Sequence, residues 1–257
     1  ALGTSAMRAL PLGVPKVMVT TVASGDTKPY VGTRDVVMFP SVVDVAGVNR
    51  ISAKIYANAV GAIVGMVETE APPVAAKPLI AATMFGNTTP AVERAKAIFE
   101  GHGYEVLVFH ATGTGGRTME DLVADGFFEG VADITTTEWA DELVGGVLTA
   151  GPTRLEAAGK AGIPQVIVPG CLDMVNFWAP ETVPEKFKDR RFYRWNPNVT
   201  LMRTTPEENA ELGRILAEKA NAARGPVAFY LPLKGVSMLD APGKEFWWPE
   251  ADAALFE

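Results

Sequence analysis

The sequence predicts an α/β protein built from doubly wound parallel sheets. Short apolar runs rich in β-branched residues, such as residues 17–22 (VMVTTV), alternate with longer segments whose apolar residues recur at helical spacing. Glycine, threonine or proline stands in the turns between several of these runs and the segments that follow them. This alternation of strand and helix is typical of parallel sheets that carry helices on both faces.

The first unit is expected to cover residues 1–72 and to be the C-terminal part of a longer domain, because the chain opens as though inside a helix. Residues 17–22 and 36–39 are predicted strands. Residues 49–67 are a predicted helix, since isoleucine, alanine and methionine side chains form one apolar stripe along them. The proline-rich residues 70–78 are the best candidate for a linker.

The second unit, residues 73–257, continues the same pattern. Strands are predicted at residues 79–85 and 104–109 and near residues 134, 165–168, 199–202 and 227–231. Helices are predicted at residues 91–100, 118–124, 139–144, 154–161 and 206–223. This order predicts a second doubly wound sheet.

Composition limits the classes of partner. The formal net charge is −7, whereas a protein that binds nucleic acid or an anionic membrane by charge usually presents a basic face. No apolar run is long enough to span a bilayer. The single cysteine, Cys171, cannot form an intrachain disulfide, which fits a reducing compartment. We therefore expect a cytoplasmic protein with no nucleic-acid or membrane partner, and a homo-oligomer if helix 49–67 exposes an apolar face.

The glycine-rich residues 110–117 (HATGTGGR) are the strongest candidate for a ligand-binding loop. They follow a predicted strand, and in open parallel sheets ligands bind outside the carboxyl ends of the strands. The glycines permit close approach of the backbone, the threonines offer hydroxyl groups, and the arginine could pair with a phosphate or carboxylate. A flexible turn before a capped helix would explain the same composition. The residues expected to contact an anion are Thr112, Gly113, Thr114, Gly115, Gly116 and Arg117.

Other polar side chains also follow predicted strands. Asn87 and Thr88 keep polar groups that the capping of a helix by the neighbouring Thr89 does not use. Asn176 is a candidate for hydrogen bonding to a ligand, and Arg203 is a second candidate for clamping an anion. A crevice for a small anionic ligand would then be built from loops 86–90, 112–117 and 170–176.

A catalytic site is the alternative to a binding site. His110 would act as acid or base, with Glu138 or Asp173 to orient it, in a hydrolase or lyase acting on a small anionic substrate. Glu138 can equally well begin a helix, where a negative side chain suits the helix dipole. Convergence of the three side chains would support the enzyme. The third possibility is a non-catalytic interaction module whose loops serve only assembly.

A smaller polar turn follows the first predicted strand. Ser24, Gly25 and Asp26 could hold a sugar, a phosphate or Mg²⁺ at this place. A tight turn closed by the aspartate side chain would explain the same three residues equally well.

Six segments of the chain resemble the Tm-one-like ATP-binding family. They are residues 20–26 (TTVASGD), 45–51 (VAGVNRI), 109–117 (FHATGTGGR), 137–143 (TEWADEL), 172–177 (LDMVNF) and 198–204 (NVTLMRT). Together they extend over essentially the whole chain. The resemblance implies two Rossmann-like α/β domains, with ATP, possibly together with Mg²⁺, bound mainly by the first.

The same resemblance sets limits on the ATP site. Family members usually carry a glycine-rich turn upstream of the position of Ala1, and they usually continue past Glu257 into a last strand and helix. Thr4 would lie directly after that upstream turn, and residues 24–26 would form the remaining wall of the site. The chain is therefore expected to be truncated at both ends and to carry an incomplete nucleotide site.

Overall fold

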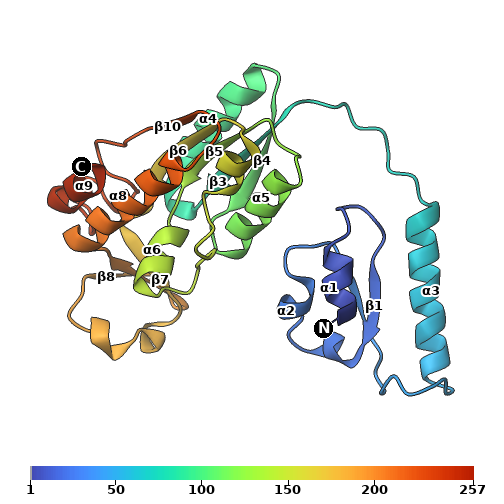
Figure 1. Ribbon diagram of the computed structural model, residues 1–257. Coiled ribbons are helices and arrows are strands. Elements are labelled where there is room, and N and C mark those ends of the chain that lie inside the picture. The colour runs from blue at the N-terminus through green and yellow to red at the C-terminus, as the bar shows by residue number, and fades with distance from the viewer. Residues whose placement is uncertain (1) are drawn as a thin grey trace. The chain divides into compact units, whose positions relative to one another are not determined.

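The computed structural model describes residues 2–257 (Figure 1). The chain divides into two compact units, the first ending at Ala75 and the second spanning Ala76–Glu257. Both units combine parallel strands with helices, so the α/β class predicted from the sequence is confirmed. Within the described residues, no helix has both the length and the apolar character needed to cross a bilayer.

The first unit holds a two-stranded parallel sheet. Its elements are α1 (Leu2–Arg8), β1 (Val17–Thr20), η1 (Thr21–Ser24), α2 (Lys28–Val31), β2 (Val37–Pro40) and α3 (Ser52–Glu68). The two strands pair with Val17 opposite Val37. Ala59 is the only fully buried apolar side chain among residues 2–75. This unit therefore has very little core of its own.

Helix α3 carries an exposed apolar stripe. The helix begins at Ser52, three residues later than predicted, because the side chain of Asn49 accepts the backbone N–H of Ser52 at 2.9 Å. Val60, Val64 and Val67 recur at helical spacing and are 59%, 45% and 68% exposed. An exposed stripe of this kind is what a homo-oligomer would present. The oligomeric state stays a prediction.

The second unit is built on a five-stranded parallel sheet. Its strands are β3 (Leu79–Met84), β4 (Glu105–His110), β5 (Gly130–Thr135), β6 (Gln165–Gly170) and β10 (Val227–Phe229), in the order β10-β6-β5-β3-β4. Its helices are α4 (Thr89–Gly101), α5 (Thr114–Ala124), α6 (Glu138–Val144), α7 (Ala157–Ala161), α8 (Pro206–Asn221) and α9 (Pro249–Phe256). Two short 3-10 turns, η3 (Pro180–Thr182) and η4 (Glu185–Phe187), precede α8, and a third, η2 (Gly86–Thr88), precedes α4.

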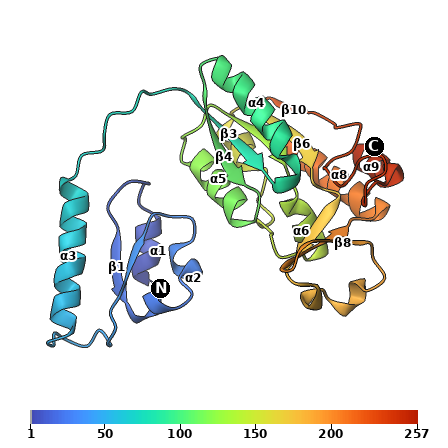
Figure 2. The same cartoon turned by 180° about the vertical axis from the view of Figure 1, so that it is seen from behind.

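Helices cover both faces of this sheet, as the predicted doubly wound fold requires (Figure 2). Successive side chains of a strand point to opposite faces. On one face Ala81 of β3 packs in a cluster with Met119 and Val123 of α5. On the other face Ala82 of β3 packs in a cluster with Val92 of α4. Alternation along one strand thus places α4 and α5 on opposite sides.

A three-stranded antiparallel sheet extends the second unit beyond the predicted fold. It consists of β7 (Met174–Phe177), β8 (Phe192–Asn196) and β9 (Val199–Arg203) in the order β7-β9-β8. The sequence pattern predicts only β9 of these three. The strands β7 and β8 are 4 and 5 residues long, too short to establish a period that can be told from a loop.

The order of the parallel strands identifies one place for a ligand. Counted along the chain, the strands of the sheet lie in the order 2-1-3-4-5, so the direction of winding reverses between β3 and β5. In open α/β sheets the crevice outside the carboxyl ends of the strands at such a reversal is where ligands bind. The segments that follow Met84 of β3 and Thr135 of β5 therefore lie at this reversal.

Candidate functional site

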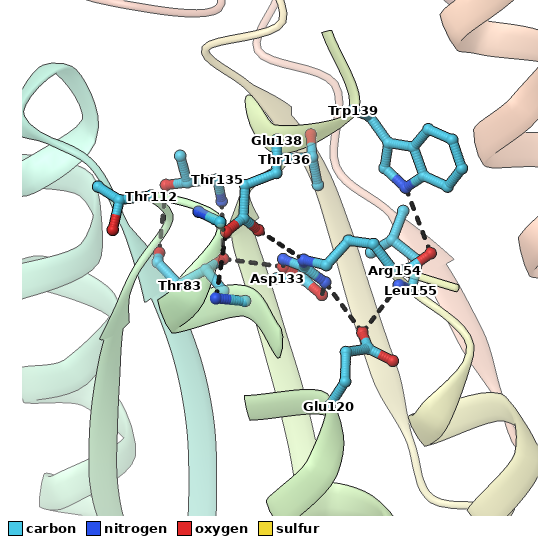
Figure 3. A network of polar contacts seen from close by, with 12 residues as sticks. Thr83, Thr112, Glu120, Asp133, Thr135, Thr136, Glu138, Trp139, Arg154 and Leu155 are labelled. Carbon is cyan, nitrogen blue, oxygen red and sulfur yellow. Dashed lines mark hydrogen bonds and ion pairs between the residues drawn. The ribbon is translucent and has the colours of Figure 1, made fainter. Parts of the chain in front are cut away.

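Arg154 is a fully buried arginine whose guanidinium contacts three carboxylates (Figure 3). Its Nε donates to Glu138 at 2.7 Å. Its Nη1 donates to Asp133 at 2.7 Å and to Glu120 at 3.1 Å, and its Nη2 also donates to Asp133. Asp133 and Glu138 are themselves buried. The guanidinium is therefore engaged entirely inside the protein, between β5, α5 and α6.

The glycine-rich loop wraps around the carboxylate of Glu138. Gly113 and Gly116 donate their backbone N–H groups to Glu138 Oε1 at 2.7 and 3.1 Å. A Cβ at Gly116 would overlap that carboxylate, so only glycine fits here. Two of the backbone N–H groups that were predicted to bind a ligand therefore donate to the side chain of Glu138 instead. The predicted roles of the remaining loop residues, the two threonines, Gly115 and the exposed Arg117, stay predictions.

Burial shifts the protonation of this cluster. It raises the pKa of Glu120 and of Glu138, and the attraction of Arg154 opposes that rise only in part. One guanidinium faces three carboxylates, so two of the acids are biased toward their neutral form. Buried charges arranged in this way hold structural elements together. Removal of one partner strongly destabilises the fold, because it leaves a buried charge without compensation.

A chain of threonines connects the Arg154 cluster to the start of α4. Thr83 donates its hydroxyl to Asp133 Oδ1 at 2.8 Å and accepts the backbone N–H of Thr135 at 3.0 Å. The hydroxyl of Thr135 lies 2.7 Å from that of Thr88. These contacts lie between β3 and β5, at the reversal of the strand order. They fix the segment after β3 against the end of β5.

A pocket of about 260 Å³ lies beside Thr88, at the carboxyl ends of β5 and β6. We call it the edge pocket. Its lining is Asn87, Thr88, Pro90, Ala91, Ile134, Val168, Gly170, Pro232, Gly235, Val236, Ser237 and Met238. Asn87 is 4% exposed, and its carboxamide oxygen has no hydrogen-bond partner among the described residues. Asn87, which lines the pocket, thus keeps one buried acceptor without a partner among the described residues.

Asp173 is held against this pocket through Ser237. The Ser237 hydroxyl donates to Asp173 Oδ2 at 2.7 Å, whereas Oδ1 has no partner within the described chain. Asp173 is fully buried. Burial raises its pKa to about 7, although the nearby Arg203 acts in the opposite direction. A carboxyl group of this kind can exchange a proton near neutral pH.

Asn176 and Arg203 are buried and bonded within the protein. Asn176 donates its Nδ2 to Asp141 at 3.2 Å. Arg203 donates to Asp252 and to the backbone oxygen of Phe246, both at 2.8 Å. Neither residue is among those that line the edge pocket. Their predicted roles as ligand contacts stay predictions.

The three residues proposed for catalysis do not form one cluster. His110 packs edge-on against the ring of Phe85, with 5.6 Å between the ring centroids. In the described part of the chain, no hydrogen bond or ion pair links it to Glu138 or Asp173, which have the separate partners given above. Cys171 is fully buried, and burial raises the pKa of its thiol. A catalytic role for His110, Glu138 or Asp173 stays a prediction.

The polar turn of the first unit is exposed and follows β1. Its Gly25 donates a backbone N–H to Val22 at 2.9 Å, and Asp26 Oδ1 accepts the N–H of Lys28 at 3.1 Å. Thr4, in contrast, is buried. The turn geometry accounts for one oxygen of Asp26, and the nucleotide-binding role of these residues stays a prediction.

Fold and site together define a doubly wound α/β protein with a small, largely apolar pocket at the carboxyl edge of its larger sheet, to which Asn87, Thr88 and Ser237 add polar groups. The family model for the C-terminal domain of the uncharacterised protein family UPF0261 matches residues 77–257, and the model for its N-terminal domain matches residues 1–72. The chain belongs to this family.

The chain is similar to curated proteins from bacteria and from a plant. A UPF0261 protein of Clostridium tetani is 60% identical over 252 residues, which are 98% of this chain and 62% of that protein. The UPF0261 protein RA0729 of Rhizobium meliloti is 55% identical over 258 residues, 99% of this chain and 64% of that protein. The ToMV resistance protein Tm-1(GCR237) of Solanum lycopersicum is 50% identical over 257 residues, 98% of this chain and 34% of that protein. The chain therefore spans less than two thirds of each of these relatives.

Sequence reasoning missed the part of the pocket that comes from residues 232–238 (PLKGVSM). This segment has no periodicity, and Ser237 stands in it without any motif around it. The sequence gives a weak indication of the role of Asp133, because this residue is a lone carboxylate within a strand of otherwise small and apolar residues. An isolated acid in a buried strand needs a cationic partner, and that partner is Arg154.

The stability of the second unit should fall as the pH rises from about 4 to about 7. Asp141 and Asp173 have pKa values of about 7 in the folded protein, because both are buried, against an ordinary value of 3.8. Folding then favours the protonated acids, so their stabilisation is complete below the ordinary value and is lost as the pH passes the raised one. Urea unfolding followed by tryptophan fluorescence between pH 4 and pH 8 measures this.

The isosteric Asp173→Asn variant should make that pH profile shallower, since it cannot ionise and keeps an oxygen for Ser237, whereas Asp141 keeps its own contribution. A wild-type midpoint that rises across the same window would contradict the assignment of the two raised pKa values.

Proposed function

We propose that the second unit binds a small organic anion in the edge pocket, with Asn87 and Ser237 as hydrogen-bonding partners. The observation that carries this proposal is the buried carboxamide oxygen of Asn87, which has no partner among the described residues. Asn87 itself lines a pocket at the carboxyl ends of parallel strands. An unpaired buried acceptor costs roughly 1–3 kcal/mol. A ligand with a hydroxyl or amino donor at this point would offset that cost.

The lining of the pocket favours a ligand with a single negative charge. Thr88, Pro90 and Ala91, at the start of the 13-residue helix α4, contribute to the lining, and the N-terminus of a helix attracts anions. No lysine or arginine is among the described lining residues. A carboxylate therefore suits the pocket better than a polyphosphate does.

The size of the pocket points the same way. Its 260 Å³ falls below the range of about 300–1,000 Å³ that is usual for drug-sized ligands. We therefore propose that the edge pocket binds a small hydroxy acid or amino acid. The nucleotide would bind to a different part of the chain.

The first unit is the proposed place for ATP. Residues 24–26 are exposed at the carboxyl end of a parallel strand, which is where nucleotides meet such sheets. One oxygen of Asp26 is engaged in the turn, which leaves the other for Mg²⁺ or a ribose hydroxyl. Thr4 is buried within α1, so a contact between this residue and a nucleotide stays a prediction. These described residues would supply one wall of a nucleotide site.

A hydrolase or lyase acting on the same small anion is the second candidate. It is favoured by the pairing of Ser237, which lines the pocket, with Asp173, whose pKa lies near neutrality. Asp173 would take or return a proton through the serine hydroxyl. If the small anion binds without being converted, the enzyme is excluded and the binding protein remains as the proposed function.

The test is a thermal-shift and calorimetry panel on the whole chain with glycolate, lactate, glycerate and serine, and with ATP and Mg²⁺ in parallel. A compound that fits the edge pocket should stabilise the protein by roughly 2.7 kcal/mol at one hundred times its dissociation constant. NMR of the same mixtures reports any conversion of the compound.

Asn87→Ala should weaken carboxylate binding at least tenfold. It removes the unpaired oxygen together with the weak contact of Nδ2 with Met174 Sδ at 3.5 Å, so the stability of the ligand-free protein should change little. The matched control is Asn221→Ala at the exposed end of α8, which should change neither quantity. ATP binding should be unaffected by Asn87→Ala. The proposal fails if no carboxylate stabilises the chain, or if its effect survives in Asn87→Ala.

A further inference from the structure

A second pocket lies on the antiparallel sheet, away from the residues considered so far. It has a volume of about 420 Å³. Its lining is Pro180, Val183, Pro184, Glu185, Lys188, Phe192, Arg194 and Thr200. We call it the sheet pocket. It shares no residue with the edge pocket, so the two are separate sites of the second unit.

The register of β8 and β9 explains why polar groups meet in the sheet pocket. Arg194 of β8 stands directly opposite Thr200 of β9, so their side chains lie on the same face of the sheet. Phe192 is two residues before Arg194 and therefore points to that face as well. The segment 180–188, which contains η3 and η4, supplies the rest of the wall.

Two of these side chains have no partner in the described part of the protein. The hydroxyl of Thr200 makes no hydrogen bond with a described residue. It is buried, and the residue as a whole is only 4% exposed. The guanidinium of Arg194 is exposed, and no hydrogen bond or ion pair with another described residue engages it. Both side chains line the sheet pocket, so an anionic group bound there can accept hydrogen bonds from the guanidinium and from the hydroxyl.

The remaining lining adds apolar surface and a small positive charge. Lys188 pairs with Glu185 at 3.5 Å, and both are exposed, so these two charges largely offset each other. The positive charge of Arg194 is then the net charge of the lining residues. Val183, Phe192 and two prolines provide the apolar part of the lining. A volume of 420 Å³ is within the usual range for a small-molecule site.

We propose that the sheet pocket is a second ligand site, which binds a carboxylate with a compact apolar body. The guanidinium of Arg194 binds the carboxylate in its planar fork, and the hydroxyl of Thr200 donates to one of the same oxygens. The hydrocarbon part of the ligand packs against Phe192 and Val183. This site is independent of the edge pocket and of its proposed function.

The test uses phenylacetate and isovalerate as probes on the whole chain, with binding measured by calorimetry and ligand-observed NMR. Inorganic phosphate serves as a bare anion for comparison. We expect both carboxylates to bind with millimolar or tighter affinity. Arg194→Ala should weaken them at least tenfold, and Thr200→Val should weaken them several-fold. Asn87→Ala, in the edge pocket, should have no effect.

Thr200→Val provides a second readout that needs no ligand. Because the hydroxyl has no partner, the isosteric valine should leave the thermal midpoint unchanged or raise it. Arg214→Ala, which removes an exposed arginine from α8, is the control for loss of charge. Absence of carboxylate binding, unchanged binding in Arg194→Ala, equal binding of phosphate and phenylacetate, or a lowered midpoint in Thr200→Val would each overturn the proposal.

Discussion

Replacing Arg154 by alanine should destabilise the second unit by about 3–5 kcal/mol at pH 7, because one change leaves two buried carboxylates and a half-buried one without their cation. All five tryptophans of the chain lie in the second unit, so tryptophan fluorescence during urea unfolding reports on that unit alone. The expected result is a large fall in the urea midpoint.

The effect of Arg154→Ala should depend on pH. The raised pKa values of Glu120 and Glu138 will rise further when the guanidinium is absent, since its attraction is what opposes the effect of burial. Acidification from pH 7 favours the neutral form of these acids, so the difference between variant and wild type should shrink as the pH is lowered. A difference that grows on acidification would contradict the role given to Arg154.

The matched control is Arg214→Ala. Arg214 also contacts two carboxylates, Glu211 and Glu218, but at the exposed surface of α8. Ion pairs of this kind contribute little because water screens the charges. The control should unfold at the wild-type urea concentration. If both variants behaved alike, burial would not be the reason for the importance of Arg154.

Replacing Gly115 by alanine should destabilise the second unit by roughly 3 kcal/mol or more, at the upper end of the costs of overpacking. A Cβ at Gly115 would overlap the backbone carbonyl of His110. That carbonyl cannot retreat easily, because His110 is the last residue of β4 and pairs with Met84 of β3. The measurement is again urea unfolding followed by tryptophan fluorescence.

Gly101→Ala is the control for the change of residue type alone. Gly101 lies in the last turn of α4, and no atom would lie within 4 Å of the added Cβ. Alanine there should change the free energy of unfolding by at most about 1 kcal/mol, in the stabilising direction. Equal stability of Gly115→Ala and wild type would show that the loop is loose rather than packed around Glu138.

Much of the fold could be predicted because local patterns decide it. An apolar run followed by a threonine and a proline was enough to predict β3 and α4, since the run suits a buried strand and Pro90 suits the first turn of a helix. The same reasoning located β4, α8 and most of the parallel strands. It did not locate β7 or β8, which are short and owe their strand structure to pairing with β9.

Less of the candidate site could be predicted. Asn87 and Thr88 were identified from polar groups that helix capping does not use, and the structure places both in the lining of the edge pocket. Ser237 was not identified, because its neighbours carry no pattern and its contact with Asp173 joins distant parts of the chain. The glycine-rich loop was predicted to bind an anionic ligand. In the structure two of its N–H groups bind the carboxylate of Glu138, and the binding of a ligand stays a prediction.

The α/β class and the position of most strands and helices follow from local sequence patterns, because periodicity, capping and turn residues act over a few positions. Tertiary structure alone decided which side chains meet. Arg154 reaches carboxylates that are 34, 21 and 16 positions away, and they converge because β5 lies beside β3 and the N-terminus of α5 lies beside the start of α6. The order of strands in a sheet follows from the packing of the whole unit, and no local pattern encodes it.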